Sequence, residues 1–378
     1  MKNNSYKVFP FYFPQFYATK ENDMWWGKGF TDWELVKKAQ AVHQSQSQPR
    51  IPLNGYYDQS DPVVIKKQSK LASEYGIDGF NFYHYWFDGT VLLDKPMQNL
   101  YNDKSIDIEY FFTWANETWT RQWVGRPQDL LIKQEHKVDI NIWNEHYEYL
   151  RKFFLDDRYL KINNSPVLCI YRPELVKSLS EWVAFFNNKA KCDGFNGIHF
   201  IALRAYSIAN ADSVYKYFDK IVNFQPRFAI NTHLKKSSPL KKLIESTLRI
   251  APEWLQLQLV RIIKNKRATY NQYKYSDYIQ SMKNDVTEYK GKPVYPVVFP
   301  DWDNAPRYKE NATFFCESSA YGFEKALNIA CDITRNHDDK LIFINAWNEW
   351  SEGAYLEPDE MHKYSSLEII KKVFQDKR

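Results

Sequence analysis

Eight short apolar runs recur along the 378 residues of this chain, and each run ends in polar or aromatic side chains. Segments with helical spacing separate the runs. In residues 61–75, for example, Asp61 and Pro62 form a capped start, apolar residues share one helical face, and Gly76 follows. Strands that alternate with helices indicate a parallel barrel or a doubly wound sheet. The runs comprise residues 6–13, 77–82, 108–112, 167–171, 199–203, 221–225, 294–299 and 341–344.

The ends of these runs favour the barrel. No G-x-G-x-x-G fingerprint follows the first run, so a nucleotide-binding doubly wound sheet loses its main support. In an α/β fold of the (β/α)8 TIM barrel type, the active site lies at the C-terminal ends of the strands, where the polar residues gather in this sequence. We therefore predict such a barrel over residues 1–378 as a single catalytic domain, because no linker or repeat divides the chain. The other predicted helices comprise residues 141–155, 175–189, 321–335 and 366–375.

Two segments exceed the needs of a bare barrel. Residues 18–54 form an extended first βα loop, and residues 229–276 form a basic helical insertion after the sixth strand. Lysines and arginines between Lys235 and Arg267 alternate with apolar residues, so the insertion is a candidate lid or a helix that rests on an anionic membrane surface. A solvated face over an ordinary core contact explains this pattern equally well. Nucleic-acid binding is not expected, because the aromatic residues gather at strand ends.

The N-terminus and the hydropathy pattern bear on location. The chain enters its first strand at Tyr6 without a signal-peptide hydrophobic region, and no apolar stretch is as long as a membrane span. We therefore expect a cytoplasmic protein, with peripheral contact between the insertion and the inner leaflet of the cytoplasmic membrane as an option. The four cysteines lack metal-ligand spacing, and buried free thiols are expected.

Two strand ends carry the residue types of a sugar-cleaving site, because both combine glutamates with Asn and Trp. Carboxyl pairs perform acid/base chemistry on glycosidic bonds, and indole faces stack on pyranose rings. Solvated glutamates at an amphipathic strand end are the simpler interpretation, but the repetition of the pattern argues against it. We expect Glu349 and Glu352 to be catalytic. The predicted substrate-binding residues at these two ends are Trp114, Asn116, Glu117, Trp347 and Asn348.

Other strand ends and the first loop add candidates. Asp301 and Asp303 follow the seventh run with the Asp-x-Asp spacing that holds a divalent ion and a diphosphate in sugar-nucleotide transferases. Their place at a strand end beside Asn304 favours hydrogen bonds to sugar hydroxyls instead. We predict no metal ion and no other cofactor. The remaining predicted substrate-binding residues are Trp26, Tyr83, His84 and Trp86.

Several ordered blocks of sequence carry a family resemblance. They comprise residues 12–16, 25–33, 48–50, 55–58, 75–80, 114–117 and 346–353. Over nearly its whole length the chain resembles the WbsX-type proteins of bacterial O-antigen and capsule biosynthesis, which are related to glycoside hydrolase family 99. The resemblance implies a (β/α)8 fold and action on α-linked, mannose-like sugars.

The resemblance also implies roles for the two glutamates. The Glu-Trp-x-Glu-Gly motif of the hydrolase family falls on Glu349 and Glu352. Glu349 would then deprotonate the 2-hydroxyl of the sugar, which attacks the anomeric carbon and gives a 1,2-anhydro sugar. Glu352 would protonate the leaving oxygen and afterwards activate water. Accordingly, we expect apolar enclosure to keep Glu352 protonated, and hydrogen bonds to keep Glu349 ionised.

Three functions fit these observations. A retaining glycosidase or transglycosylase acting on an oligosaccharide or a lipid-linked glycan follows from the glutamate pair; a sugar-nucleotide-dependent glycosyltransferase and a non-catalytic glycan-binding protein are the alternatives. The glutamates, Glu117, Tyr83, His84, Trp114 and Asn348 are expected to line one pocket. Among six tryptophans, at least one should expose its indole there and at least half should be core residues. These six are Trp25, Trp26, Trp33, Trp86, Trp114 and Trp119.

Overall fold

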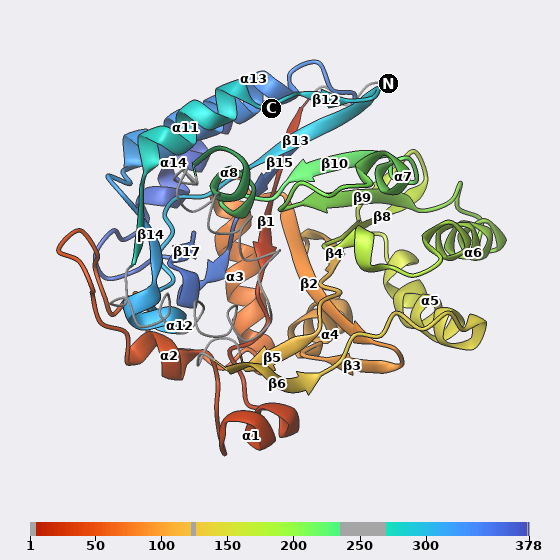
Figure 1. Cartoon of the computed structure of the whole chain (residues 1–378), viewed down its shortest axis with the longest axis horizontal. Helices are drawn as coiled ribbons and strands as arrows, with labels where there is room; N and C mark the ends of the chain where they lie inside the picture. The colour runs from red at the N-terminus through yellow and green to blue at the C-terminus, as the bar shows by residue number, and fades with distance from the viewer. Residues whose placement is uncertain (1–4, 122–125, 235–269, 376, 378) are drawn as a thin grey trace, which may run out of the picture.

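The computed structural model describes residues 5–121, 126–234, 270–375 and 377. Parallel strands pair in the order β1-β15-β13-β10-β9-β8-β4-β2, and pairing of β1 with β2 closes the sheet into a barrel (Figure 1). The predicted (β/α)8 TIM barrel is therefore confirmed. The barrel strands are β1 (Tyr6–Tyr12), β2 (Gly79–Phe87), β4 (Glu109–Trp114), β8 (Ser165–Ile170), β9 (His199–Arg204), β10 (Lys220–Asn223), β13 (Lys292–Val298) and β15 (Lys340–Ile344).

The helices that cover the barrel begin and end close to the predicted positions. In α3 the side chain of Asp61 accepts a hydrogen bond from the Val63 N–H, and Pro62 occupies the first turn. The buried face of this helix includes Ile65 and Ala72, which pack toward the barrel. The predicted helices correspond to α3 (Pro62–Glu74), α5 (Ile140–Phe154), α6 (Leu179–Cys192), α13 (Ala320–Thr334) and α14 (Ser365–Phe374).

Aromatic rings fill the interior of the barrel. Phe11 packs edge-on against Phe224 with ring centroids 5.3 Å apart, and it also contacts Phe343. Phe9 packs against Phe111 in the same way. The ring of Phe9 leaves no room for a side chain at Gly79, because an added Cβ would lie 2.6 Å from that ring. The core of the barrel is thus a tightly packed set of large side chains.

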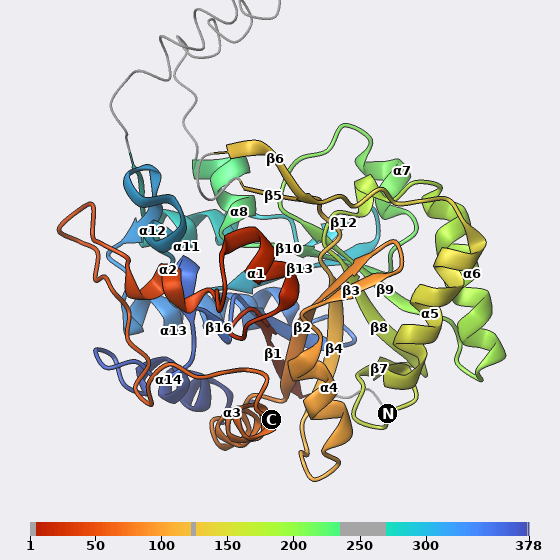
Figure 2. The ribbon, with the colours of Figure 1, turned by 90° about the horizontal axis from the view of Figure 1, so that it is seen from below.

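The loops that follow the strands gather at one end of the barrel, at the top of Figure 2. The first connection contains α1 (Lys20–Trp26) and α2 (Trp33–Lys37), as expected of an extended first loop. After β10 come α8 (Arg227–Ala229) and, further on, β11 (Asn271–Lys274), which pairs with β14 (Thr313–Cys316). The basic residues of the predicted insertion fall within 235–269, outside the described residues, so the lid and the membrane contact stay predictions. Within the described ranges, no helix combines the length and apolar character needed to cross a membrane.

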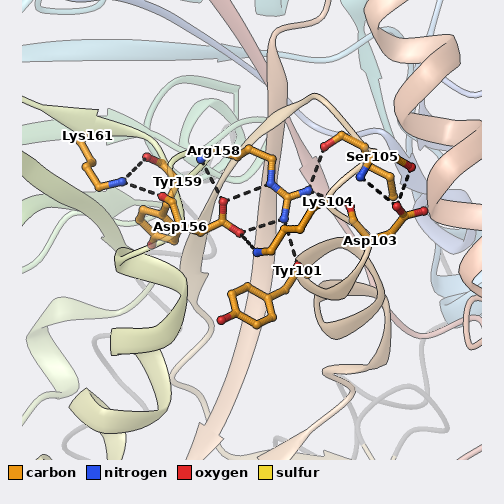
Figure 3. Close-up of polar contacts among 9 residues, drawn as sticks. Tyr101, Asp103, Lys104, Ser105, Asp156, Arg158, Tyr159 and Lys161 are labelled. Atoms are coloured by element: carbon orange, nitrogen blue, oxygen red, sulfur yellow. Dashed lines mark hydrogen bonds and ion pairs between the residues drawn. The ribbon is translucent and has the colours of Figure 1, made fainter.

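An ion cluster at the opposite end of the barrel fixes the loops that precede β4 and β8 (Figure 3). Arg158 donates to the carboxylate of Asp156 and to the backbone oxygens of Tyr101, Asp103 and Ile106. Burial opposes ionisation of Asp156, but hydrogen bonds from Arg158 and Lys104 outweigh it and lower the pKa of this carboxyl group. The cluster is therefore a structural support placed far from the loops that follow the strands.

We predict that Arg158→Met lowers the free energy of unfolding by about 3 kcal/mol at neutral pH, because it leaves the buried carboxylate of Asp156 without its main partner. The deficit should shrink as the pH falls below about 4, since a carboxyl with a lowered pKa contributes its stability only above its unfolded-state pKa. Lys104→Met is the control: it removes a 60 % exposed partner of the same carboxylate and should cost about 0.5 kcal/mol. Chemical denaturation across pH measures both, and equal losses in the two variants would refute the assignment.

Candidate active site

A pocket opens at the end of the barrel where the strands finish, and Glu349 and Glu352 line it. Both lie in a short segment after β15, made of β16 (Asn348–Glu349) and a 3-10 turn (Trp350–Glu352). Tyr83 from the end of β2 and Glu117 from the loop after β4 line the same pocket, as predicted. The pocket therefore collects residues from widely separated strand ends, as TIM-barrel active sites do.

Hydrogen bonds lock the glutamate segment to the neighbouring loops. Phe13 donates its backbone N–H to Asn348 Oδ1 over 2.7 Å, and Asn348 Nδ2 donates to the Phe13 oxygen over 2.9 Å. On the other side, the Asp303 N–H donates to the Glu352 oxygen over 2.7 Å. Gly353 ends the turn with φ 64°, and an added Cβ would lie 2.8 Å from the Asp303 nitrogen, so this position requires glycine. The segment is thereby held between the loops after β1 and β13.

A buried carboxyl group supports the segment from below. Glu357 accepts hydrogen bonds from the Trp350 indole and the Tyr57 hydroxyl, both over 2.7 Å, and from Gln68 over 2.6 Å. Burial raises the pKa of Glu357 to about 7, although these donors favour the ionised form. Glu357 thus fixes an indole that directly precedes the Ser351-Glu352 turn.

Arg307 joins the two glutamates. Its terminal nitrogens donate to Glu349 Oε1 and to Glu352 Oε1, each over 2.7 Å, and one of them also reaches Asp32 Oδ2 at 3.0 Å. Ser351 donates its hydroxyl to the same oxygen of Asp32. The four charged side chains are at most 8 % exposed. One guanidinium therefore faces three buried carboxyl groups.

This charge arrangement favours a retained proton. Burial raises the pKa of Glu349 to about 8; Arg307 opposes the shift, and the negative charges of Glu352 and Asp32 add to it. The expectation that hydrogen bonds keep Glu349 ionised at neutral pH is therefore wrong, because one arginine cannot compensate three buried carboxylates. The main physical cause is burial of the carboxyl group, to which the excess of negative charge adds.

The pocket wall adds a second cation and several phenols. Arg227, at the start of α8, lies 3.9 Å from Glu352 Oε1. Tyr83, Tyr85 and Tyr171 line the pocket, and burial raises the pKa of each of these phenols, so they remain neutral hydrogen-bond donors. Such donors suit the hydroxyl groups of a sugar.

The tryptophans divide as expected. Trp26 and Trp119 are partly exposed and line the pocket, where an indole face can stack on a sugar. Trp33, Trp86 and Trp114 are core residues with exposures of 4 %, 5 % and 3 %.

Three predicted binding residues at strand ends do not line the pocket. His84 Nε2 lies 3.0 Å from His146 Nε2 on α5, and Trp86 stacks on the same His146 ring. Trp114 stacks on Trp182 of α6. Successive strand residues point to opposite faces, so His84 and Trp86 face the helices while Tyr83 and Tyr85 face the pocket. The prediction that His84 and Trp114 share the pocket with the glutamates is therefore wrong.

The remaining predicted binding residues have structural partners instead of an exposed place in the pocket. Asn116 is bonded to the backbone of Arg172 at both its oxygen and its nitrogen, and Asn348 is bonded to Phe13. Trp347 is fully buried against Phe80. These side chains satisfy backbone groups or fill the core, which corrects the prediction that they line the pocket.

The Asp-x-Asp pair also holds loops together. Asp301 accepts a hydrogen bond from Arg50 over 2.7 Å, and Asp303 accepts hydrogen bonds from Gln46 and Gln48 over 2.8 Å each. All three donors belong to the first βα loop, and neither aspartate lines the pocket. Their predicted contact with sugar hydroxyls is therefore wrong.

Several residues of the pocket and of the charge cluster around Arg307 escaped the sequence analysis. Asp32 lies inside one of the blocks that carry the family resemblance, so that block contained a signal for it. Tyr85 follows Tyr83 at the spacing of one strand face. Arg227 and Arg307 lie in the short helices α8 and α12 (Ala305–Tyr308), and no local pattern distinguishes them from other arginines.

The closed barrel, with a carboxyl pair at the C-terminal ends of its strands, is similar in fold to several solved structures. Among solved structures, a glycoside hydrolase-like protein matches with a TM-score of 0.57 at 13 % identity over 99 % of this chain and 95 % of that one. The GH99 endo-alpha-mannosidase from Bacteroides thetaiotaomicron matches with a TM-score of 0.56 at 14 % identity, over 98 % and 97 % of the two chains. At these identities the likeness shows the fold.

Sequence comparison supplies the family. The model for the glycosyltransferase WbsX family matches residues 8–370, and the chain belongs to this family. WxcX proteins from two strains of Xanthomonas campestris pv. campestris are 31 % identical over 368 residues, which is 96 % of this chain and 48 % of each relative. The chain thus spans about half the length of these curated relatives.

We predict that Glu349→Gln stabilises the protein increasingly as the pH rises. A carboxyl with a raised pKa contributes stability below its unfolded-state pKa and loses it as the pH rises toward about 8. The gain in the free energy of unfolding should be small near pH 5 and reach about 2 kcal/mol near pH 9. Glu117→Gln, which removes a 34 % exposed pocket carboxylate paired with Arg172, is the control without such a gain. If the free energy of unfolding of Glu349→Gln differed from that of the wild type by the same amount at every pH, the buried-charge argument would be contradicted.

Proposed function

We propose that this protein cleaves or transfers an α-linked, mannose-like glycosyl unit of a bacterial surface polysaccharide, with retention through a 1,2-anhydro sugar. The observation that carries the proposal is the bridging of Glu349 and Glu352 by one guanidinium in a pocket at the strand ends. A neighbouring-group reaction needs two carboxyl groups, one near the 2-hydroxyl and the other near the leaving oxygen. The shared partner keeps these two groups together.

The reaction has two balanced steps. The 2-oxygen attacks the anomeric carbon while Glu349 takes the 2-hydroxyl proton; the bond to the leaving oxygen breaks, and Glu352 gives that oxygen its proton. Water, or the hydroxyl of an acceptor sugar, then attacks the anomeric carbon and passes its proton to Glu352. The bond between the anomeric carbon and the 2-oxygen breaks, and Glu349 returns the first proton to the 2-oxygen. Two inversions give net retention, in the manner of substrate-assisted glycosidases.

The raised pKa of Glu349 suits its proposed role as the base, because Arg307 is bonded to the same carboxyl group. A base with a pKa near the working pH takes a proton more readily than an ordinary carboxylate does. The guanidinium, 2.7 Å from Glu349 Oε1, stabilises the ionised form that starts the reaction. Trp26 and Trp119 supply stacking surfaces, and the Tyr83 hydroxyl is placed to bond a sugar.

Sugar-nucleotide-dependent transfer is the second candidate, and the description of the family as a glycosyltransferase favours it. Its metal motif would be Asp301-x-Asp303. Both carboxylates are already engaged by donors of the first loop, so an ion would have to displace Arg50 and two glutamines. We therefore place transfer to a sugar acceptor at the glutamate pair.

The setting of the reaction remains part of the proposal. A cytoplasmic enzyme of this kind would act on an oligosaccharide or a lipid-linked glycan assembled at the inner leaflet, with residues 1–378 as one catalytic domain. Non-catalytic glycan binding would use the same pocket but would not need a buried glutamate pair bridged by one arginine. That pair is the reason to prefer catalysis.

Activity of the two glutamine variants should differ. Glu349→Gln should lose about 10³-fold or more in kcat/KM on all donors, because nothing activates the 2-hydroxyl. Glu352→Gln should lose most activity on natural glycans and retain more on activated aryl glycosides, whose leaving groups need no proton. The kcat/KM of the wild type should rise with pH toward about 8, as Glu349 ionises. A profile that falls over this range would reverse the roles of the two residues.

Donors without the 2-hydroxyl should be inert with the wild-type protein, because the internal nucleophile is missing. Matched 2-deoxy and 2-hydroxy aryl glycosides, compared by product release, test this. Normal turnover of the 2-deoxy donor would require an enzyme nucleophile and refute the mechanism. Calorimetry with manganese and nucleoside diphosphate sugars tests the second candidate, which tight metal-dependent binding would establish.

A further inference from the structure

Arg227 presents unused hydrogen-bond donors to the pocket. It begins α8 directly after β10, and its side chain is 34 % exposed. Within residues 5–121, 126–234 and 270–375, no hydrogen bond to another side chain or backbone group engages its guanidinium, and its nearest charge partner is Glu352 at 3.9 Å. A guanidinium carries five N–H donors in a fixed fork. Arg227 therefore lacks a close acceptor.

Two other arginines near the pocket are paired with carboxylates. Arg307 donates to three carboxyl groups, and Arg172 is paired with Glu117 and Glu174. Glu352 Oε1 already accepts from Arg307 over 2.7 Å, so it is an incomplete partner for Arg227. A guanidinium with free N–H donors forms charge-assisted hydrogen bonds when an anion binds beside it.

A neutral hydroxyl donor lines the same pocket as this cation. It is the phenol of Tyr171, which directly follows β8. Within the described ranges its hydroxyl bonds to no other residue, so it can donate to a ligand oxygen. A guanidinium fork and a phenol together match the oxygens of a carboxylate or phosphate, which accept bidentate hydrogen bonds.

We propose that Arg227 and Tyr171 form an anion subsite, and that the glycan processed here carries a negative group beside the scissile linkage. The group is the carboxylate of a uronic acid or a phosphate ester. This inference rests on the proposed function and names its substrate class. An anion placed there also lies near the Glu349–Glu352 pair, so binding should favour the protonated form of Glu349 and take up a proton from solution.

Titration calorimetry with uronic acids, sugar 1-phosphates and the corresponding neutral sugars tests the subsite. We expect at least one anionic probe to bind about tenfold or more tightly than its neutral counterpart. Repeating the titration in two buffers with different ionisation enthalpies should reveal proton uptake for the anionic probe alone. Preference for the uronic acids or for the phosphates identifies the source of the negative group.

Variants separate the subsite from general charge effects. Arg227→Met should abolish the preference for the anionic probe, and Arg227→Lys, which keeps the charge but not the fork, should retain part of it. Arg121→Met is the matched control: it removes a cation that stacks on Trp26 with 5.0 Å to the ring centroid, and it should leave the preference unchanged. Thermal unfolding verifies that each variant is folded.

Two results would overturn the inference. Equal affinities for neutral and anionic probes in the wild type, or a preference that survives in Arg227→Met, would show that Arg227 only balances the charge of the glutamates. The proposed function would stand in both cases, because neutral sugars still bind. Failure of every probe to bind would count against the pocket as a glycan site and so against both proposals.

Discussion

A single guanidinium, that of Arg307, holds together carboxyl groups that would otherwise repel one another. Asp32 comes from the first βα loop, and Glu349 and Glu352 come from the segment after the last strand. Each group is buried, so water and salt screen the interactions between their charges only weakly. The bridge keeps the first and last loops of the barrel in contact, while burial and the remaining negative charge raise the pKa of Glu349. The packing of these loops and the ionisation of Glu349 therefore depend on the same contact.

The barrel could be predicted from the sequence because its strands are buried on both faces. Parallel strands of this kind appear as continuous apolar runs, and all eight runs correspond to barrel strands. The same property hides the direction in which each side chain points. Every residue of β2 is buried, so hydrophobicity alone could not tell that Tyr83 and Tyr85 face the pocket while His84 and Trp86 face α5. Strict alternation, counted from Tyr83, would have separated them.

The candidate site was predictable in part. The glutamates stand in a local motif with tryptophans, and local motifs can be recognised without a structure. Arg307 cannot be found in this way, because its ion pair with Asp32 joins residues 275 positions apart. Asp301 and Asp303 show the opposite error: their spacing resembles a metal motif, but donors from the first loop occupy both carboxylates. Only tertiary partners distinguish a carboxylate that holds a loop from one that meets a substrate.

The bond between Phe13 and Asn348 has a consequence for biosynthesis. It joins residues 335 positions apart. Phe13, at the end of the first strand, can therefore form this bond only after the last strand and Asn348 have been synthesised. Chains grow from the N-terminus, and contacts between distant residues carry the largest loop-closure cost during folding. A nascent chain therefore holds Asp32 and Phe13 without a complete pocket until the segment that contains Glu349 and Glu352 has been synthesised. The pocket and its glutamate pair are thereby completed only after the last strand has been made.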